Sequence, residues 1–325
     1  MNNTIKFLVS KINVERLDVY LSKNMKNYTR SFIKKLILQK LVRVNRKIST
    51  SPSLKIKKND RIFIKIVKKR EKEIIPKKIK LNIIYEDSDI LVINKPKGLV
   101  VHPGAGNFQN TLANGLVFRY KKNLSNINGD FRPGIVHRID KETSGLLVIA
   151  KNNLSHSILS EQFSNHTIKR KYDCLVWGVI RPLNGRIETL IARNKNNRQL
   201  MTVSEINGKR AVTNYKTLKV FASKDTPKIS LVECELETGR THQIRVHFKY
   251  KGTSLIGDEQ YGKKNIKFKK INKQFLENLK SIKGQALHAK TLEFIHPTQK
   301  KWMSFRSNHP LDFKKMLSFL NNLNG

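Results

Sequence analysis

Apolar residues recur at helical spacing in two short segments near the start of the chain, and a polar face remains on each. Residues 42–45 and 61–66 then alternate with a period of two, as half-buried strands do. This pattern predicts two helices and a small curled sheet in one compact domain over residues 1–75. The apolar helix positions are Leu17, Tyr20 and Leu21 in the first segment and Ile33, Leu36, Ile37 and Leu41 in the second.

A charged stretch containing Pro76 follows at residues 67–80, which we expect to be a linker, and a larger domain occupies residues 76–325. Strand patterns dominate this domain, with sparser helical patterns, so we expect an α+β fold with a mixed, mostly antiparallel sheet flanked by helices. The clearest strands are residues 91–93, 146–150, 172–177, 211–221 and 229–236, and the helices are residues 153–165, 240–250 and 271–282.

The composition adds an extreme positive charge. The chain of 325 residues has 65 Lys and Arg against 24 Asp and Glu, a formal net charge of +41. Such a field attracts phosphate backbones. Part of the lysine excess can equally be neutral drift on solvated faces, so the charge indicates a polyanionic partner without identifying it.

The cysteine and hydropathy patterns indicate the cellular compartment of the protein. Cys174 and Cys234 lie far apart without C-x-x-C spacing, which predicts neither a disulfide framework nor a zinc site. The apolar run near the start is too short for a signal peptide, and no stretch approaches the ~20 apolar residues of a membrane span. We therefore expect a cytoplasmic protein.

Residues 134–151, G-I-V-H-R-I-D-K-E-T-S-G-L-L-V-I-A-K, carry the strongest chemical signal. Asp140 lies two residues after Arg138 and in a turn that ends at Gly145, directly before an apolar strand. A loop of this kind presents a reactive acid from a rigid sheet. Taken alone, it could also be an ordinary polar turn before a buried strand.

Further segments offer groups that could join Asp140. The segment N-K-P-K-G-L-V-V-H-P-G-A-G-N, residues 94–107, is a Gly- and Pro-rich loop after an apolar strand. R-K-Y-D-C-L-V-W-G presents Tyr172 at the start of a strand, and G-D-E-Q-Y-G follows at residues 257–262. In E-T-G-R-T-H-Q-I-R-V-H we expect a helix on which Thr241, His242 and Arg245 share one face.

The first domain resembles an S4 RNA-binding domain, in R-L-D-V-Y-L, S-F-I-K-K-L-I and L-V-R-V-N-R-K-I. Arg46 stands where that family often has glycine. The resemblance implies that the basic surface of this domain contacts RNA. Its candidate RNA-binding residues are Arg30, Lys34, Lys35 and Arg43.

The whole chain resembles the RluA/RluC/RluD class of RNA pseudouridine synthases, through H-R-I-D-K-E-T-S-G, the [KR]-x-Y pattern at residues 170–172, and G-R-T-H-Q-I-R-V-H. Within this class, the motifs H-P-G-A-G and G-D-x-x-Y-G most resemble those of the D-type enzymes that act on 23S ribosomal RNA. The resemblance implies that Asp140 acts on the ribose, Arg245 is its ion-pair partner, and the Tyr172 ring stacks on the uracil. Arg138 would fill the space that the target nucleotide leaves in the RNA.

Conversion of uridine to pseudouridine breaks the C1′–N1 bond and joins C1′ to C5 without a redox change, so we expect no cofactor and no metal. A carboxylate can act as a nucleophile at C1′ or as a base at C2′, and the sequence does not choose. The partner is expected to be 23S ribosomal RNA, at the helix 69 stem-loop, with the protein a monomer. The alternatives are a C-type or tRNA-directed synthase and a catalytically silent assembly factor that binds ribosomal RNA.

Overall fold

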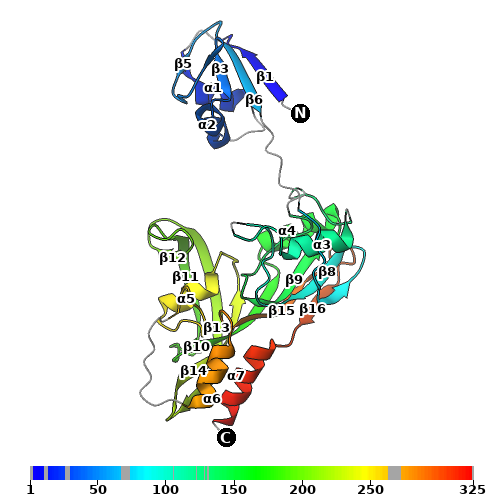
Figure 1. Ribbon diagram of the computed structural model, residues 1–325, viewed down its shortest axis with the longest axis vertical. Helices are drawn as coiled ribbons and strands as arrows, with labels where there is room; N and C mark the ends of the chain where they lie inside the picture. Colours follow the sequence, from blue (N-terminus) through cyan, green and yellow to red (C-terminus); the bar gives the residue numbers. More distant parts are fainter. Residues whose placement is uncertain are drawn as a thin grey trace. The chain divides into compact units, whose positions relative to one another are not determined.

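The computed structural model describes residues 3–10, 14–25, 30–66, 74–104, 106–121, 123–127, 129, 132–262 and 272–323. The chain divides into two compact units, residues 1–72 and 73–325 (Figure 1). In the described parts of the chain, no helix is both long and apolar enough to cross a membrane.

The small unit packs two helices against an antiparallel sheet with the strand order β1-β6-β3-β4. All the predicted apolar helix positions are buried except Leu41, which is partly buried, and they join the sheet in one core. This confirms the predicted helix pair and sheet. The elements are β1 (Asn3–Leu8), β2 (Glu15–Arg16), α1 (Leu17–Asn24), α2 (Arg30–Leu38), β3 (Val42–Val44), β4 (Lys47–Ile48), β5 (Lys55–Ile56) and β6 (Arg61–Ile66).

A two-residue turn joins β3 to β4, and both of its residues have left-handed backbone conformations. Asn45 has φ 49° and Arg46 has φ 68°. The amide of Asn45 stabilises the turn, because it donates to Asp60 at 2.7 Å and accepts the backbone N–H of Arg61 at 2.9 Å. Arg46 therefore adopts the conformation that glycine adopts with least strain, and the exchange leaves a closed turn.

The large unit is built on one ten-stranded mixed sheet, in which β15 and β9 form a parallel pair and the other pairs are antiparallel. The strand order is β12-β11-β13-β14-β10-β15-β9-β8-β7, and β16 pairs with β15. Its strands are β7 (Ile83–Glu86), β8 (Ile90–Lys95), β9 (Ser144–Ala150), β10 (Lys169–Trp177), β11 (Asn184–Arg193), β12 (Met201–Ser204), β13 (Lys209–Ser223), β14 (Thr226–Leu236), β15 (Leu287–Ile295) and β16 (Trp302–Arg306).

Helices cover this sheet, so alternate residues of one strand enter different cores. Tyr172 and Cys174 of β10 face a core that includes Phe248 of α5, whereas Leu175 and Trp177 face the core under α6 and α7. Figure 1 shows α6 and α7 side by side near the C-terminus. The α+β expectation is confirmed. The helices are α3 (Leu112–Tyr120), α4 (Asn153–Ser164), α5 (Gln243–Tyr250), α6 (Lys273–Ser281) and α7 (Leu311–Asn322).

The expected linker is shorter than residues 67–80. Residues 67–73 lie outside the described residues, but residues 74–80 belong to the large unit. Ile74 is buried in its core, and the carbonyl of Ile75 accepts a hydrogen bond from the Asn114 side chain at 2.8 Å. The apolar pair Ile74-Ile75 interrupts the charged run and attaches this segment to α3.

Candidate active site

The loop that carries Asp140 is held at both ends before it enters β9. The Nε2 atom of His137 accepts the backbone N–H of Val148 at 3.0 Å, and Gln285 donates to the Thr143 hydroxyl at 2.9 Å. At Gly145, φ is +117°, and an added Cβ would lie 2.2 Å from the carbonyl oxygen of Ala289 in β15. Glycine is required there because the parallel pair brings two backbones into close contact.

A buried lysine also fixes this loop. Lys95 is 1% exposed, and its Nζ donates to the carbonyl oxygens of Pro96 (2.8 Å), Leu99 (2.8 Å) and Lys141 (3.0 Å). Burial lowers the pKa of Lys95 to about 7, although the negative charges of Glu142 and Asp140 oppose this effect. The ammonium ties the residue after Asp140 to the Gly- and Pro-rich loop.

Asp140 and Arg245 form an ion pair, with 3.0 Å between Oδ2 and Nη1. The same guanidinium donates to both oxygens of Asp258, at 2.7 and 2.8 Å, and to Oε1 of Gln260 at 2.9 Å. Burial favours a lower pKa for Arg245, but the hydrogen bond and charge of Asp258 and the charge of Asp140 outweigh it and raise the pKa. Arg245 therefore stays a cation beside the Asp140 carboxylate.

His242 also lies beside Asp140, with Nε2 3.9 Å from Oδ1. The Tyr261 hydroxyl accepts the backbone N–H of Met201 at 2.7 Å and lies 2.8 Å from Nδ1 of His242. Burial lowers the pKa of His242, so the ring is neutral. If the hydroxyl donates to Nδ1, the ring proton is on Nε2, which faces Asp140.

One expectation for this segment is wrong. Helix α5 begins at Gln243, so Thr241 and His242 do not share a helical face with Arg245. His242 precedes the helix with φ 58°, in the left-handed region, which turns its ring toward Asp140. Such strain at a non-glycine residue is typical of functional sites.

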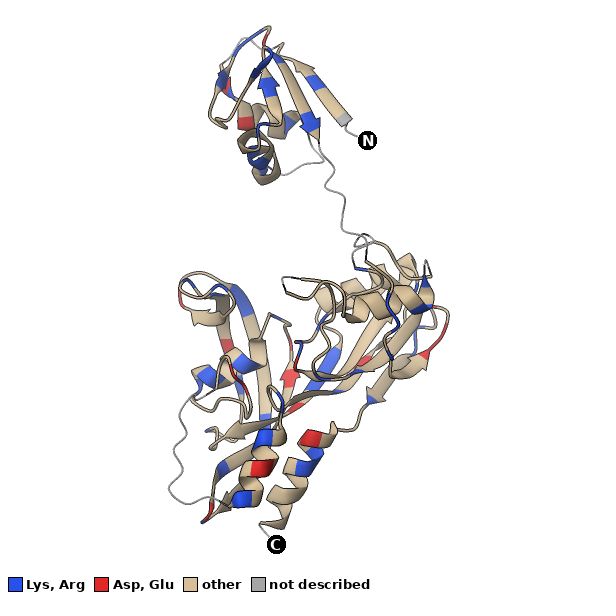
Figure 2. Ribbon diagram, in the orientation of Figure 1, with Lys and Arg blue, Asp and Glu red and all other residues tan. Residues whose placement is uncertain are grey.

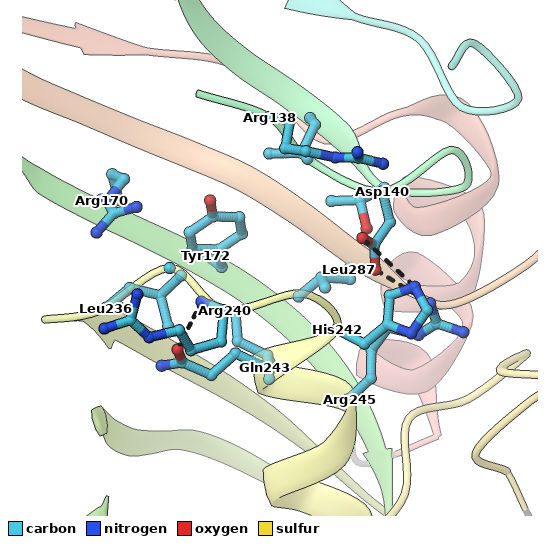
Figure 3. A pocket seen from close by; sticks show the side chains of 14 residues that line it. Arg138, Asp140, Arg170, Tyr172, Leu236, Arg240, His242, Gln243, Arg245 and Leu287 are labelled. Atoms are coloured by element: carbon cyan, nitrogen blue, oxygen red, sulfur yellow. Dashed lines mark hydrogen bonds and ion pairs between the residues drawn. The ribbon is translucent and has the colours of Figure 1, made fainter. Parts of the chain in front are cut away.

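Tyr172 lines the same pocket as Asp140 and Arg245, as Figure 3 shows. The side chain is buried, and burial together with the charge of Asp140 raises the pKa of its hydroxyl, against a smaller opposite effect of Arg170. The ring is therefore a neutral apolar wall. The three residues that the sequence indicated for catalysis thus face one pocket, although they are far apart in the chain.

Arg138 is exposed at the edge of this pocket and also borders a larger adjoining groove of about 1030 Å³. Its Nη1 donates to Nε2 of His102 at 3.3 Å. Burial, with the charges of Arg138 and Arg132, lowers the pKa of His102 to about 4, so the ring is neutral and accepts this bond. His102 belongs to H-P-G-A-G and connects that loop to the Asp140 loop.

In the small unit, the four candidate RNA-binding residues differ in their environment. Arg30 donates to the fully buried Asp18 at 2.9 and 3.1 Å, and Lys34 lies 3.8 Å from the same carboxylate. Burial favours a raised pKa for Asp18, but the hydrogen bonds of Arg16 and Arg30 lower it. Lys35 and Arg43 are exposed, with no ion pair among the described residues. Figure 2 shows lysine and arginine spread over both units.

One cluster in the described chain has ligand atoms close enough for a metal ion: Asp87, Asp89 and His296. Its atoms are already engaged. His296 lies 2.8 Å from Asp87 through Nε2 and accepts the N–H of Gln299 through Nδ1, and Thr298 donates to Asp89. The cluster is thus a hydrogen-bonded anchor of the β15–β16 turn.

The sequence indicated Asp140, Tyr172 and Arg245 but assigned no role to Lys95, Asp258 or Tyr261. Each of the latter lies in a motif that was visible in the sequence, in N-K-P-K-G or G-D-E-Q-Y-G. Only their contacts with Lys141, Arg245 and His242 distinguish them from ordinary turn residues, and local patterns do not reveal these contacts.

Comparisons with known proteins show the family of the chain. The family described as RNA pseudouridylate synthase matches residues 89–250, and the S4 domain family matches residues 15–62. The chain belongs to the RNA pseudouridylate synthase family, because relatives in this family match nearly its full length.

Three relatives are similar over most of both chains. The uncharacterized RNA pseudouridine synthase YlyB of Bacillus subtilis is 41% identical over 94% of each chain. Ribosomal large subunit pseudouridine synthase D is 42% identical in Zymomonas mobilis, covering 94% of this chain and 93% of the relative, and 42% identical in Buchnera aphidicola subsp. Baizongia pistaciae, covering 99% of each.

A solved structure is also similar. Human RNA Pseudouridylate Synthase Domain Containing 4 is 26% identical, with a TM-score of 0.56, and covers 74% of this chain and 93% of that chain. This similarity supports the fold of the large unit.

Proposed function

We propose that the protein isomerises specific uridines of 23S ribosomal RNA to pseudouridine in the cytoplasm, as a monomer that needs no cofactor. The observation that carries the proposal is the 3.0 Å ion pair of Asp140 and Arg245 in a pocket shared with Tyr172. The relatives named for the large ribosomal subunit support this RNA as the substrate. Their D-type name motivates the helix 69 stem-loop as the target.

In the proposed reaction, the target uridine leaves the RNA stack and enters the pocket. The Tyr172 ring stacks on the uracil, and Arg138 enters the space left in the RNA. Asp140, paired with Arg245, either attacks C1′ or removes the C2′ proton. The C1′–N1 bond breaks and the base turns. C5 then joins C1′, which breaks the Asp140–C1′ bond or returns the proton from Asp140 to C2′, and the C5 proton leaves while N1 gains one.

The small unit is proposed to dock the enzyme on the RNA through Lys35 and Arg43, with Arg30 and Lys34 beside them. Their positive charge fits sequence-independent contacts with phosphates. Site choice would then depend on both units, while the chemistry depends on the large unit alone.

The decisive experiment uses large-subunit RNA fragments that contain uridine tritiated at C5. The wild-type protein should release tritium, because C5 loses its hydrogen, and Asp140→Asn should release none. Full release by Asp140→Asn would contradict the proposed role of Asp140. No release by the wild type from ribosomal RNA, with release from transfer RNA, would identify the tRNA-directed alternative.

A silent assembly factor would bind the RNA without any release. Mapping of pseudouridines in cellular RNA with and without the gene then identifies the modified positions and tests the helix 69 assignment.

A further inference from the structure

The pocket contains a second buried cation, which is not part of the ion pair of Asp140 and Arg245. Arg170 is 8% exposed and lines the pocket beside Tyr172. Within the described residues its guanidinium makes no hydrogen bond or ion pair, and its Nε is buried without a partner. The guanidinium carbon lies 5.3 Å from the centre of the Phe163 ring. A buried charge without an acceptor is costly, so this site is suited to an anionic ligand.

The position of Arg170 indicates which part of a bound nucleotide it would meet. Arg170 and Tyr172 lie on the same face of β10, about 7 Å apart along the strand. In Figure 3, Tyr172 lies between Arg170 and Asp140. A uracil stacked on Tyr172 with its ribose at Asp140 therefore directs the rest of its ring toward Arg170.

The residues around Arg170 add to the positive charge of the pocket. Among the described residues that line the pocket, four are arginines and one is a carboxylate, and Arg245 is already engaged by Asp140 and Asp258. The backbone also leaves space for the guanidinium of Arg170, since a Cβ at Gly239 would lie 2.7 Å from its Nη1. This accounts for a glycine in T-G-R-T-H-Q whose φ is not in the left-handed region.

We propose that Arg170 is a catalytic residue that stabilises the uracil anion formed when the C1′–N1 bond breaks; this inference rests on the proposed function. The electron pair of that bond stays with the base, and its negative charge is shared by N1, O2 and O4. C1′ meanwhile bonds to Asp140, or C2′ loses a proton to it. The anion is retained until C5 bonds to C1′, which breaks the C1′–Asp140 bond or returns the proton from Asp140 to C2′. C5 then releases its proton and N1 takes one up.

In this role, Arg170 is a hydrogen-bond donor that is already in place where negative charge develops on the uracil. A guanidinium donates hydrogen bonds and accepts none, so it suits the carbonyl oxygens of uracil and disfavours the amino group of cytosine. Because Arg170 is buried, its effect on a developing anion is larger than at the surface.

The test compares Arg170→Met, Arg170→Lys and the control Lys171→Met in single-turnover reactions with saturating enzyme. Lys171 is the next residue on β10 and pairs instead with Glu233 and Glu235, at 3.6 and 3.8 Å. Arg170→Met should lower the rate about a hundredfold, the loss typical of one such donor, with RNA affinity unchanged. Arg170→Lys should lose less, and Lys171→Met nothing.

A second substrate separates catalysis from a structural role. In RNA containing 5-fluorouridine, fluorine itself stabilises the uracil anion, so cleavage of the C1′–N1 bond should depend less on Arg170. The rate ratio of wild type to Arg170→Met should therefore be smaller than with uridine, as followed by chromatography of the digested nucleosides. Equal ratios with both substrates, or no loss with either, would overturn the proposal.

Gly239→Ala provides an independent variant if Arg170→Met does not fold. The added methyl group displaces the flexible guanidinium of Arg170, which keeps its charge. The rate ratio of wild type to Gly239→Ala should again be smaller with 5-fluorouridine than with uridine. An unchanged rate in Gly239→Ala and Arg170→Lys would also overturn the proposal. If the proposed function itself were wrong, the wild type would release no tritium. If only the role of Arg170 were wrong, the wild type would still release it.

Discussion

Arg245 donates two hydrogen bonds to Asp258 and only one to Asp140. Asp258 has a fully buried side chain, whereas the Asp140 side chain is 18% exposed toward the pocket. The arginine is therefore oriented by one carboxylate and acts on the other. Asp258 also accepts the backbone N–H groups of Gln260 and Tyr261, so a single turn fixes the cation of the site.

Asp258→Asn should damage catalysis through Arg245. It removes half of a buried ion pair, which costs about 3 kcal/mol of unfolding free energy, and a displacement of the guanidinium should lower kcat about a hundredfold. RNA affinity should stay unchanged, because Asp258 does not line the pocket. Tritium release and urea unfolding measure the two effects.

Glu259→Gln is the matched control. It removes a carboxylate from the same turn, and among the described residues Glu259 makes no hydrogen bond to Arg245. Its kcat should equal that of the wild type. A wild-type kcat in Asp258→Asn would show that Asp258 does not position Arg245.

The stability of the large unit should fall when the pH drops below about 6.5, because it contains buried neutral histidines. Burial lowers the pKa of both His247 and His288 to about 4. Between pH 6.5 and 4 the unfolded chain takes up protons that the folded chain does not. Stability is therefore complete above pH 6.5 and is lost as the pH falls toward 4, by about 3 kcal/mol for each histidine.

Urea unfolding at a series of pH values checks this slope. His288→Gln should make it shallower, since one titrating group is removed, while His166→Asn at an exposed position should leave it unchanged. A slope that is identical in wild type and His288→Gln would contradict the explanation.

The small unit allows a separation of RNA binding from folding. Lys35→Ala and Arg43→Ala should weaken binding to ribosomal RNA and reduce its salt dependence, because each removes an exposed charge. Unfolding should not change. Arg30→Ala should instead destabilise the unit, since the buried Asp18 loses two hydrogen bonds.

Binding titrations at several salt concentrations and thermal unfolding of the same variants distinguish residues that bind RNA from residues that stabilise the unit. Unchanged binding by the double variant of Lys35 and Arg43 would remove these residues from the proposed docking surface. Unchanged stability of Arg30→Ala would show that Asp18 is satisfied by Arg16 and Lys34.

The sequence by itself determined the elements with strong periodicity and the chemistry of the site. The apolar positions of α1 and α2, the alternation in β3 and β6 and the run that becomes β9 are local patterns, because burial on one face or on both imposes them residue by residue. Asp140, Tyr172 and Arg245 were recognisable because each lies in a distinctive motif.

Tertiary structure alone decided how these groups meet. Arg245 contacts Asp140 from 105 positions away, and Lys95 reaches the carbonyl of Lys141 across 46 positions. The start of α5 at Gln243, the role of Asp258 and the lack of an acceptor for Arg170 among the described residues likewise depend on the surroundings of each atom. Burial and pairing are properties of the packed chain, and local patterns carry no information about which distant segment supplies a partner.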